Sequence, residues 1–261
     1  QGFEDDVANS ISEHYLPIGL TSAIPKKPFS YSIAIVDKID SLVGFFLIDE
    51  KPTSSKDPFA LRRAAIGLLR IIIENKLSIR LRDLINYAIR LYEEQGVEIK
   101  NENTEMEVLG FLKERMRNIL KLKNIKIDII EASISSHSGD NFLDLYKKNL
   151  LMNKYINKDV GINAISSYKR ASNITDKVEK GISGRPDAVL FRTEEEKILF
   201  EKINEIRKAF TVKESNKDYE NLLIRLSETK QFTDNFFDNV VVNDENPDIK
   251  NNRLELLKMF C

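Results

Sequence analysis

The chain has 261 residues, of which 42% are apolar, and its 40 basic residues nearly balance its 41 acidic residues. This length allows two domains or one large helical domain, and the charge balance excludes an overall nucleic-acid charge signature. The single cysteine, Cys261, excludes a disulfide framework and a multi-cysteine zinc site. Because no apolar run approaches roughly 18 residues and no signal peptide is recognisable, we expect a cytoplasmic protein without a membrane partner.

Charge is distributed unevenly along the chain. Residues 51–90 contain nine basic and three acidic residues, residues 145–185 contain the same numbers, and residues 232–255 contain two basic and six acidic residues. Two positive regions and one negative region are compatible with a surface that faces RNA, because attraction to phosphates depends on the local field. The alternative is a solvated helical surface on which charges happen to cluster.

The first half of the chain has the apolar spacing of helices. We predict a short helix over residues 5–15 and a longer one over residues 30–46. Asp57 followed by Pro58 indicates an N-cap with proline at the first helical position. The apolar residues that follow recur at three- and four-residue intervals, which predicts a helix with one buried stripe and a basic opposite face. Further helices are expected over residues 79–94 and 101–122.

Asp37 stands in a sequence context known from metal-binding enzymes. The stretch IVDKIDSL, residues 35–42, resembles the segment that carries the last metal-binding aspartate in phosphohydrolases of the HD type. That chemistry needs several nitrogen and oxygen ligands around one divalent ion. His14 is the only histidine before Asp37, and the sequence has no His-Asp pair. We therefore expect Asp37 to be a capping or ion-paired residue.

The polar segment over residues 135–139, which ends in glycine, indicates a domain boundary between residues 138 and 139. Thr193 and Glu196 further on have the spacing of a capping box. Alternating strand patterns are nearly absent, so the predicted fold class is all-α. Helices are expected over residues 141–155, 162–174, 193–210, 217–227 and 233–241, with a last one that starts at Asn246 and Pro247.

Three stretches carry a family resemblance. They are KPTSSKDPFALRR at residues 51–63, SYKRASNIT at residues 167–175 and FTDNFFDNVVVNDENPDIKNNRLELL at residues 232–257. In this order they resemble the beta subunit of the bacterial two-subunit glycyl-tRNA synthetase, in the C-terminal part of a longer chain. The second stretch departs from the family at Ser167 and Thr175, where the family has alanine and leucine.

The resemblance implies that the chain is a C-terminal fragment with two helical parts. Residues 1–138 would be a remnant of an HD-like domain together with middle helices, and residues 139–261 would be an anticodon-binding helical bundle. Phe236 and Phe237 stand at helical spacing from Val240 and Val241, so we expect them in the core and not as platforms for stacked bases.

Seven residues in or beside these stretches are candidate RNA contacts. Arginine and lysine side chains reach phosphates, and asparagine can read the edge of an unpaired base. The candidates are Lys169, Arg170 and Asn173 in the second stretch, Asn252 and Arg253 in the third, and Arg62 and Arg63 in the first.

The resemblance also implies a function. The chain would be the tRNA-binding part of the beta subunit of glycine–tRNA ligase, and it would support ATP-dependent glycylation of tRNA(Gly) by anticodon and backbone recognition. The adenylate-forming site of this family belongs to the alpha subunit, so the implied partners are tRNA(Gly) and the alpha subunit in an alpha2beta2 heterotetramer. ATP and Mg would be used by the whole enzyme, with no cofactor site, metal site or catalytic residue in this chain.

Two alternatives come from different functional classes. One is a metal-dependent phosphohydrolase of the HD type, which the context of Asp37 suggests. The other is a non-catalytic helical scaffold that binds only protein. Salt dependence separates a scaffold from an RNA-binding protein, because affinity for phosphates falls steeply as salt rises.

Overall fold

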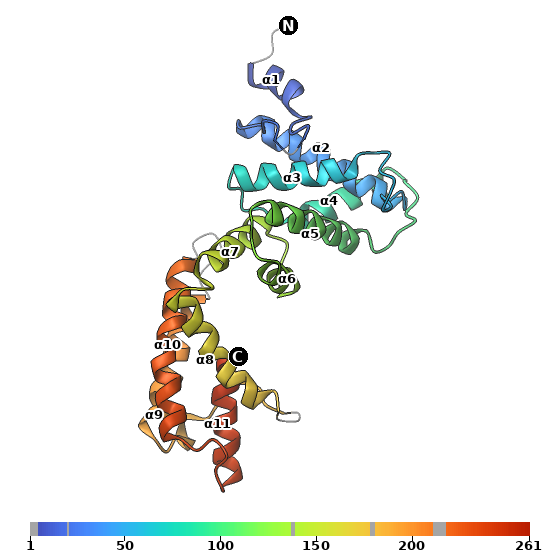
Figure 1. Ribbon diagram of the computed structural model, residues 1–261. Helices are drawn as coiled ribbons and strands as arrows, with labels where there is room; N and C mark the ends of the chain where they lie inside the picture. The colour runs from blue at the N-terminus through green and yellow to red at the C-terminus, as the bar shows by residue number, and fades with distance from the viewer. Residues whose placement is uncertain (1–4, 20, 137–138, 178–180, 211–217) are drawn as a thin grey trace. The chain divides into compact units, whose positions relative to one another are not determined.

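The computed structural model describes residues 5–19, 21–136, 139–177, 181–210 and 218–261, which form helices and loops without any strand (Figure 1). The prediction of an all-α fold is therefore confirmed. The chain divides into two compact units, Gln1–Leu150 and Leu151–Cys261. The boundary predicted between residues 138 and 139 adjoins residues 137–138, which lie outside the described residues, so it stays a prediction.

The helices follow the predicted order closely. The first unit contains α1 (Asp5–Glu13), α2 (Pro28–Leu47), α3 (Leu61–Glu74), α4 (Leu81–Glu94), α5 (Thr104–Leu122), α6 (Ile127–Ser136) and most of α7 (Phe142–Tyr155). The second unit contains α8 (Asp159–Thr175), the 3-10 helix η1 (Ala188–Leu190), α9 (Glu194–Phe210), α10 (Tyr219–Asn239) and α11 (Pro247–Phe260).

The core of the first unit is built around α2. This helix packs against α1, α3, α4 and α5, and α3 in turn packs against α5. The side chains at its centre, Leu42 and Val43, are fully buried, as are Leu68 and Leu69 of α3 and Leu112 of α5. Burial of a side chain of this kind contributes about 1.5–3 kcal/mol, so apolar packing holds these helices together.

Helix α3 begins later than predicted. It starts at Leu61, and Pro58 is part of the turn before it, so the prediction of proline at the first helical position is wrong. Ala60 takes a left-handed conformation with φ of 54°, which redirects the chain into the helix. The carboxylate of Asp57 still accepts hydrogen bonds from the backbone N–H groups of Leu61 at 2.8 Å and Arg62 at 3.0 Å. Asp57 therefore satisfies the first helical donors from four residues upstream.

The second unit is a ring of four helices. Helices α8 and α9 each pack against both α10 and α11 (Figure 1). The core between them consists of Ala171, Leu199, Ile203, Phe236, Val240, Leu256 and Leu257. Phe236 is fully buried in this core, as predicted, and Phe237 is half-buried beside it. The alternating contacts mean that each helix is held by two neighbours.

Two predicted helices are one helix in the structure. The sequence suggested separate helices over residues 217–227 and 233–241, but α10 is continuous over Tyr219–Asn239, and residue 217 lies outside the described residues. Two threonines in or beside the gap between the predicted helices form hydrogen bonds inside the helix. Thr229 donates its hydroxyl to the carbonyl of Leu226 at 2.6 Å, and Thr233 donates to the carbonyl of Thr229 at 3.0 Å. Such local hydrogen bonds let buried threonines remain within a helix.

Gly161 at the start of α8 is predicted to tolerate no side chain. A Cβ atom at this position would lie 2.2 Å from the backbone oxygen of Tyr155, which cannot move aside as a side chain can. We expect Gly161→Ala to lower the free energy of unfolding of the second unit by about 1–3 kcal/mol, the usual cost of overpacking. Urea unfolding followed by circular dichroism, fitted with one transition for each unit, measures the change.

The matched control is Gly110→Ala in α5, where a Cβ atom would meet nothing within 4 Å. Alanine there should raise the stability of the first unit by up to about 1 kcal/mol, because glycine loses more backbone freedom on folding. Equal effects of the two substitutions would contradict the packing described for Gly161.

Candidate nucleic-acid interface

One side of helix α8 is buried against the core of the second unit, and the other side is exposed. Ala171, Ser167 and Thr175 are buried against the core. Lys169 and Asn173, one helical turn apart, are exposed. Among the residues that the structure describes, the side chain of Lys169 has no hydrogen bond or ion pair. The lysine ammonium and the asparagine amide are thus both exposed to solvent, and their contact with RNA stays a prediction.

Arg170 is exposed but held against α10. Its guanidinium lies 2.9 Å from Asp234 and 3.6 Å from Asp238, and its central carbon lies 4.5 Å from the centre of the Phe237 ring. Lys230 also binds Asp234, and these two cations hold the pKa of Asp234 below its ordinary value, with Lys230 as the larger cause. The charge of Arg170 is therefore largely balanced by carboxylates, which leaves it less attraction for phosphate than Lys169 has.

Arg253 is not at the surface. The residue is 5% exposed, and its Nε donates to Glu196 at 2.7 Å. One terminal nitrogen donates to the carbonyl of Val241 at 2.8 Å and to Asp244 at 2.7 Å. This geometry contradicts the prediction that Arg253 faces RNA, because its hydrogen-bonding groups are directed into the protein. Its role is to join α11 to the start of α9 and to the loop before α11.

Glu196 is the buried partner and also caps its own helix. One carboxylate oxygen accepts from the backbone N–H groups of Arg192 at 2.7 Å and Thr193 at 2.8 Å, while the other accepts from Arg253. The hydroxyl of Thr193 accepts from the backbone N–H of Glu196 at 3.3 Å, so the predicted capping box is confirmed. Burial alone would raise the pKa of Glu196, but the hydrogen bonds from Arg253 and the two backbone groups outweigh it and lower the pKa.

Asn252 and Glu255 fix the connection between α8 and α9. Asn252 is 5% exposed and pairs with both backbone groups of Asp187, accepting from its N–H at 2.7 Å and donating to its carbonyl at 2.9 Å. Glu255 accepts from the backbone N–H groups of Ser183 at 2.8 Å and Arg185 at 2.9 Å. The burial of Asn252 contradicts the prediction that it contacts RNA. Its side-chain amide forms the two hydrogen bonds with the backbone of Asp187 that an adjacent backbone segment would otherwise form.

The two candidates in the first unit differ from each other. Arg62 is half-buried, donates to the backbone carbonyl of Thr53 and lies 3.9 Å from Asp57. It therefore holds the loop that precedes α3. Arg63 is exposed, and its position is compatible with a contact to a ligand in solution.

Asp37 and Asp57 do not belong to a cluster of metal ligands among the described residues. Among them, no group of three or more histidine, cysteine, aspartate or glutamate residues could hold a metal ion. Asp37 is half-buried on α2, and Asp57 uses both carboxylate oxygens on the backbone of α3. None of the helices that the structure describes has the length and apolarity that a membrane span requires.

One signal in the sequence could have identified the role of Arg253. Ile249, Arg253 and Leu257 recur at four-residue intervals, and both apolar neighbours are buried. An arginine inside an apolar stripe requires a buried anionic partner. Glu196 of α9 is this partner. Because it lies 57 residues from Arg253 in the sequence, the pairing could not be recognised from the sequence alone.

Comparisons with known proteins agree with these two units. The family model described as the glycyl-tRNA synthetase beta subunit matches residues 1–135, and the model of the DALR anticodon binding domain matches residues 164–261. The chain is 40% identical to the glycine–tRNA ligase beta subunit of Rickettsia canadensis (strain McKiel), over all of this chain and 38% of that protein. It is 39% identical to the subunit of the same name from Rickettsia africae (strain ESF-5), over all of this chain and 37% of that protein. The chain thus spans less than two fifths of the length of these relatives.

Removal of the buried guanidinium should destabilise the second unit strongly. Arg253→Met leaves the carboxylate of Glu196 buried without its charged partner, and breaking a buried pair in this way typically costs roughly 3–5 kcal/mol. Urea unfolding of the second unit measures the loss. Arg207→Met on the exposed surface of α9 is the matched control, and it should change stability by less than about 0.5 kcal/mol. Similar losses in both variants would contradict the buried pair.

The same pair makes stability depend on pH. The folded protein holds the pKa of Glu196 below its ordinary value of 4.5, so the pair contributes its full stability above pH 4.5. This contribution is lost as the pH falls below 4.5 towards the lowered pKa of the folded state. Unfolding measured from pH 7 to pH 3 should show a shallower acid loss in Glu196→Gln than in the wild type. Glu194→Gln, an exposed neighbour in the first turn of α9, should keep the slope of the wild type.

Proposed function

Because this chain belongs to the glycyl-tRNA synthetase beta-subunit family, we propose that it is a tRNA-binding part of a glycine–tRNA ligase. Its substrate in this role is tRNA(Gly), and the second unit binds the anticodon region. The match of residues 164–261 to an anticodon-binding domain supports this assignment, since those residues include most of α8 and all of α9, α10 and α11. Binding by this part would support the attachment of glycine to tRNA by the complete enzyme.

The observation that carries the proposal is the exposed side of α8. Lys169 and Asn173 are exposed there and lie within the region that the anticodon-binding model matches. A lysine ammonium binds phosphate as a point charge, and an asparagine amide both donates to and accepts from a base edge. This combination suits an RNA loop whose unpaired bases are accessible. Arg63 in the first unit is a further candidate for a phosphate contact.

The complete enzyme requires partners beyond this chain. An alpha subunit that forms the adenylate, in an alpha2beta2 assembly, would supply the chemistry, and ATP and Mg would be bound there. The cytoplasm, where tRNA is charged, is the compartment that this role implies.

The alternatives have less support. A phosphohydrolase of the HD type needs converging ligands near Asp37, and no such group exists among the described residues. A scaffold that binds only protein does not account for the match of residues 164–261 to an anticodon-binding domain. Neither alternative predicts salt-dependent binding of tRNA.

Replacement of Lys169 should weaken tRNA binding without weakening the fold. Lys169→Met removes one phosphate contact, so we expect affinity for tRNA(Gly) to fall about 3- to 10-fold and the slope of log affinity against log salt to decrease by about 0.7–0.9. Fluorescence anisotropy with labelled tRNA over 50–200 mM salt measures both quantities. Lys197→Met, a neutralisation on α9 where Lys197 pairs with Glu194, is the matched control and should keep the slope of the wild type.

Arg170→Met provides a second comparison. Because Asp234 and Asp238 already balance its charge, this substitution should reduce affinity less than Lys169→Met does. Equal affinities of wild type, Lys169→Met and Lys197→Met for tRNA(Gly) would reject the α8 surface as a contact.

A further inference from the structure

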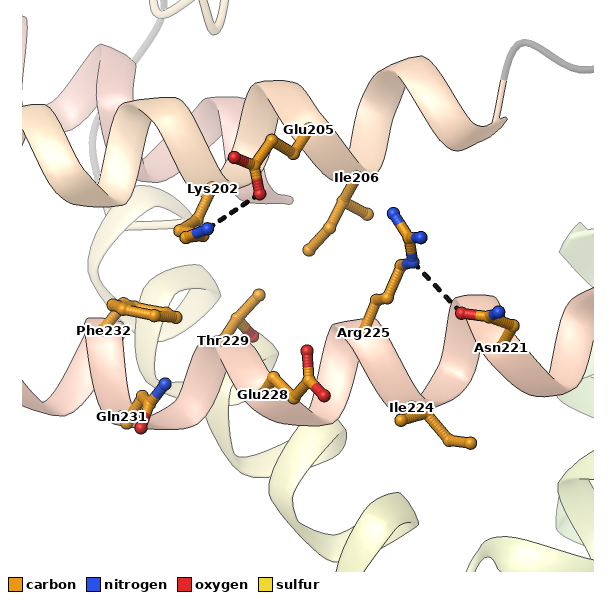
Figure 2. Close-up of a pocket in the computed structure, with 10 residues that line it drawn as sticks. All are labelled: Lys202, Glu205, Ile206, Asn221, Ile224, Arg225, Glu228, Thr229, Gln231 and Phe232. Atoms are coloured by element: carbon orange, nitrogen blue, oxygen red, sulfur yellow. Dashed lines mark hydrogen bonds and ion pairs between the residues drawn. The ribbon is translucent and has the colours of Figure 1, made fainter.

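A pocket of about 520 Å³ opens between α9 and α10 (Figure 2). It belongs entirely to the second unit and contains none of the candidate residues predicted from the sequence. Its volume falls within the roughly 300–1,000 Å³ of typical small-ligand sites, which can hold a nucleotide. The side chains around it come from one face of each helix, so the two helices together define what it can bind.

Two cationic groups extend into the space between the helices. Figure 2 shows the ammonium of Lys202 on α9 and the guanidinium of Arg225 on α10 directed into this space. Lys202 lies 2.9 Å from Glu205 at the rim, and the Nε of Arg225 donates to the side chain of Asn221 at 3.1 Å. In each case the partner leaves other donors of the cation available. An anionic group that enters the pocket would meet donors from both sides.

An aromatic ring forms part of the wall. Phe232 is half-buried, packs against the core of the unit and also lines the pocket. The ammonium of Lys202 lies 5.8 Å from the centre of its ring. Ile206 supplies a second apolar surface from α9. A planar base can stack on such a ring, and a nearby cation strengthens the site for a phosphate or an electron-rich base.

The pocket lining also includes a carboxylate, Glu228, which would repel a phosphate but can accept hydrogen bonds from a base. Glu228 is exposed on α10 within the pocket lining, and among the described residues it has no hydrogen-bond or ion-pair partner. A carboxylate accepts hydrogen bonds from the exocyclic amino groups of bases and repels a carbonyl oxygen in the same place. Uracil is the common RNA base that lacks an exocyclic amino group. The N3–H of uracil can donate, but it stands between two carbonyl oxygens that a carboxylate repels, so the carboxylate favours a base with an exocyclic amino group over uracil.

The hollow continues towards the proposed RNA-binding helix. A second depression of about 370 Å³ shares Glu228 and Gln231 with the first and reaches Asn163 on α8. Helix α8 is the helix that carries Lys169 and Asn173. An RNA strand bound along α8 would therefore have a depression that leads to the α9–α10 pocket.

From these features we propose that the α9–α10 pocket binds one unstacked nucleotide of the tRNA loop whose base carries an exocyclic amino group. The base stacks on Phe232, the amino group donates to Glu228, and Lys202 and Arg225 bind the phosphate or the acceptor atoms of the base. The assignment rests on the proposed function, because it takes tRNA as the ligand. It adds a site on α9 and α10 that selects against uracil.

A double substitution tests the cationic part of the site. Lys202→Gln with Arg225→Gln in the 261-residue chain should weaken binding of a glycine tRNA transcript at least tenfold and reduce the salt slope by about 1–2. The control is Lys197→Gln with Arg207→Gln, which removes the same charge from the surface of α9 outside the pocket. Circular dichroism at 222 nm establishes that both doubly substituted proteins remain folded.

A base series tests the selection. Transcripts with uracil placed in turn at each anticodon-loop position should include one position at which the wild type binds about tenfold more weakly. Glu228→Gln should reduce that loss to less than about threefold, because the neutral amide both donates and accepts. Glu201→Gln, a neutralisation of an exposed residue on α9 outside the pocket, should leave the loss unchanged.

The outcomes separate the two proposals. If the wild type binds the transcript with the expected salt dependence but the pocket variants equal their controls, the pocket assignment is overturned and the tRNA-binding function stands. If the wild type shows no salt-dependent binding of the transcript, both proposals are overturned. Weaker binding in the double variant, together with relaxed selection against uracil in Glu228→Gln, supports the pocket as described.

Discussion

The structure of the second unit depends on one buried ion pair, between Arg253 of α11 and Glu196 of α9. Both side chains are almost inaccessible to water, so each charge needs a full set of hydrogen bonds inside the protein. Glu196 receives them from Arg253 and from two backbone N–H groups, and Arg253 is also bound by Asp244 and the carbonyl of Val241. These hydrogen bonds all form only when the first turn of α9, the 241–244 loop and α11 are packed against one another. The buried pair therefore favours a single arrangement of these three segments.

This constraint also explains which polar residues remain available to a ligand. Asn252, Arg253 and Glu255 follow one another closely on α11, yet all three bind segments of their own unit. With these groups occupied, the proposed RNA contacts of this unit are the exposed Lys169 and Asn173 of α8 and the residues of the α9–α10 pocket. Arg170 is intermediate, since it is exposed but balanced by carboxylates of α10. Acidic residues in the 232–255 region thus mainly form contacts within the second unit.

The sequence predicted the helices well because apolar periodicity and capping are local. The capping box at Thr193 and Glu196 and the start of α11 at Asn246 and Pro247 both follow from residues within one turn. The start of α3 was misplaced because a left-handed residue at Ala60, which no local rule requires, delays the helix. The break predicted within α10 is absent, and Thr229 and Thr233 there donate their hydroxyls to carbonyls of the same helix.

The candidate site was harder to predict for a different reason. Lys169 was singled out by its residue type and by the motif that contains it, and it is exposed, but its contact with RNA stays a prediction. The burial of Arg253 depends on a glutamate 57 positions away, and the pocket depends on side chains from two helices. Contacts of this kind exist only in the folded chain. The motif resemblance located the region, but it did not separate residues that hold the fold from residues that face the ligand.

A double-mutant cycle on the two partners tests the central claim most directly. Arg253→Met, Glu196→Gln and the combined variant are compared with the wild type by urea unfolding of the second unit at pH 7. If the pair organises the unit, the combined loss will be smaller than the sum of the two single losses by about 1.5–3 kcal/mol. Additive losses, with a coupling free energy within about 0.5 kcal/mol of zero, would contradict the claim that this ion pair holds the unit together.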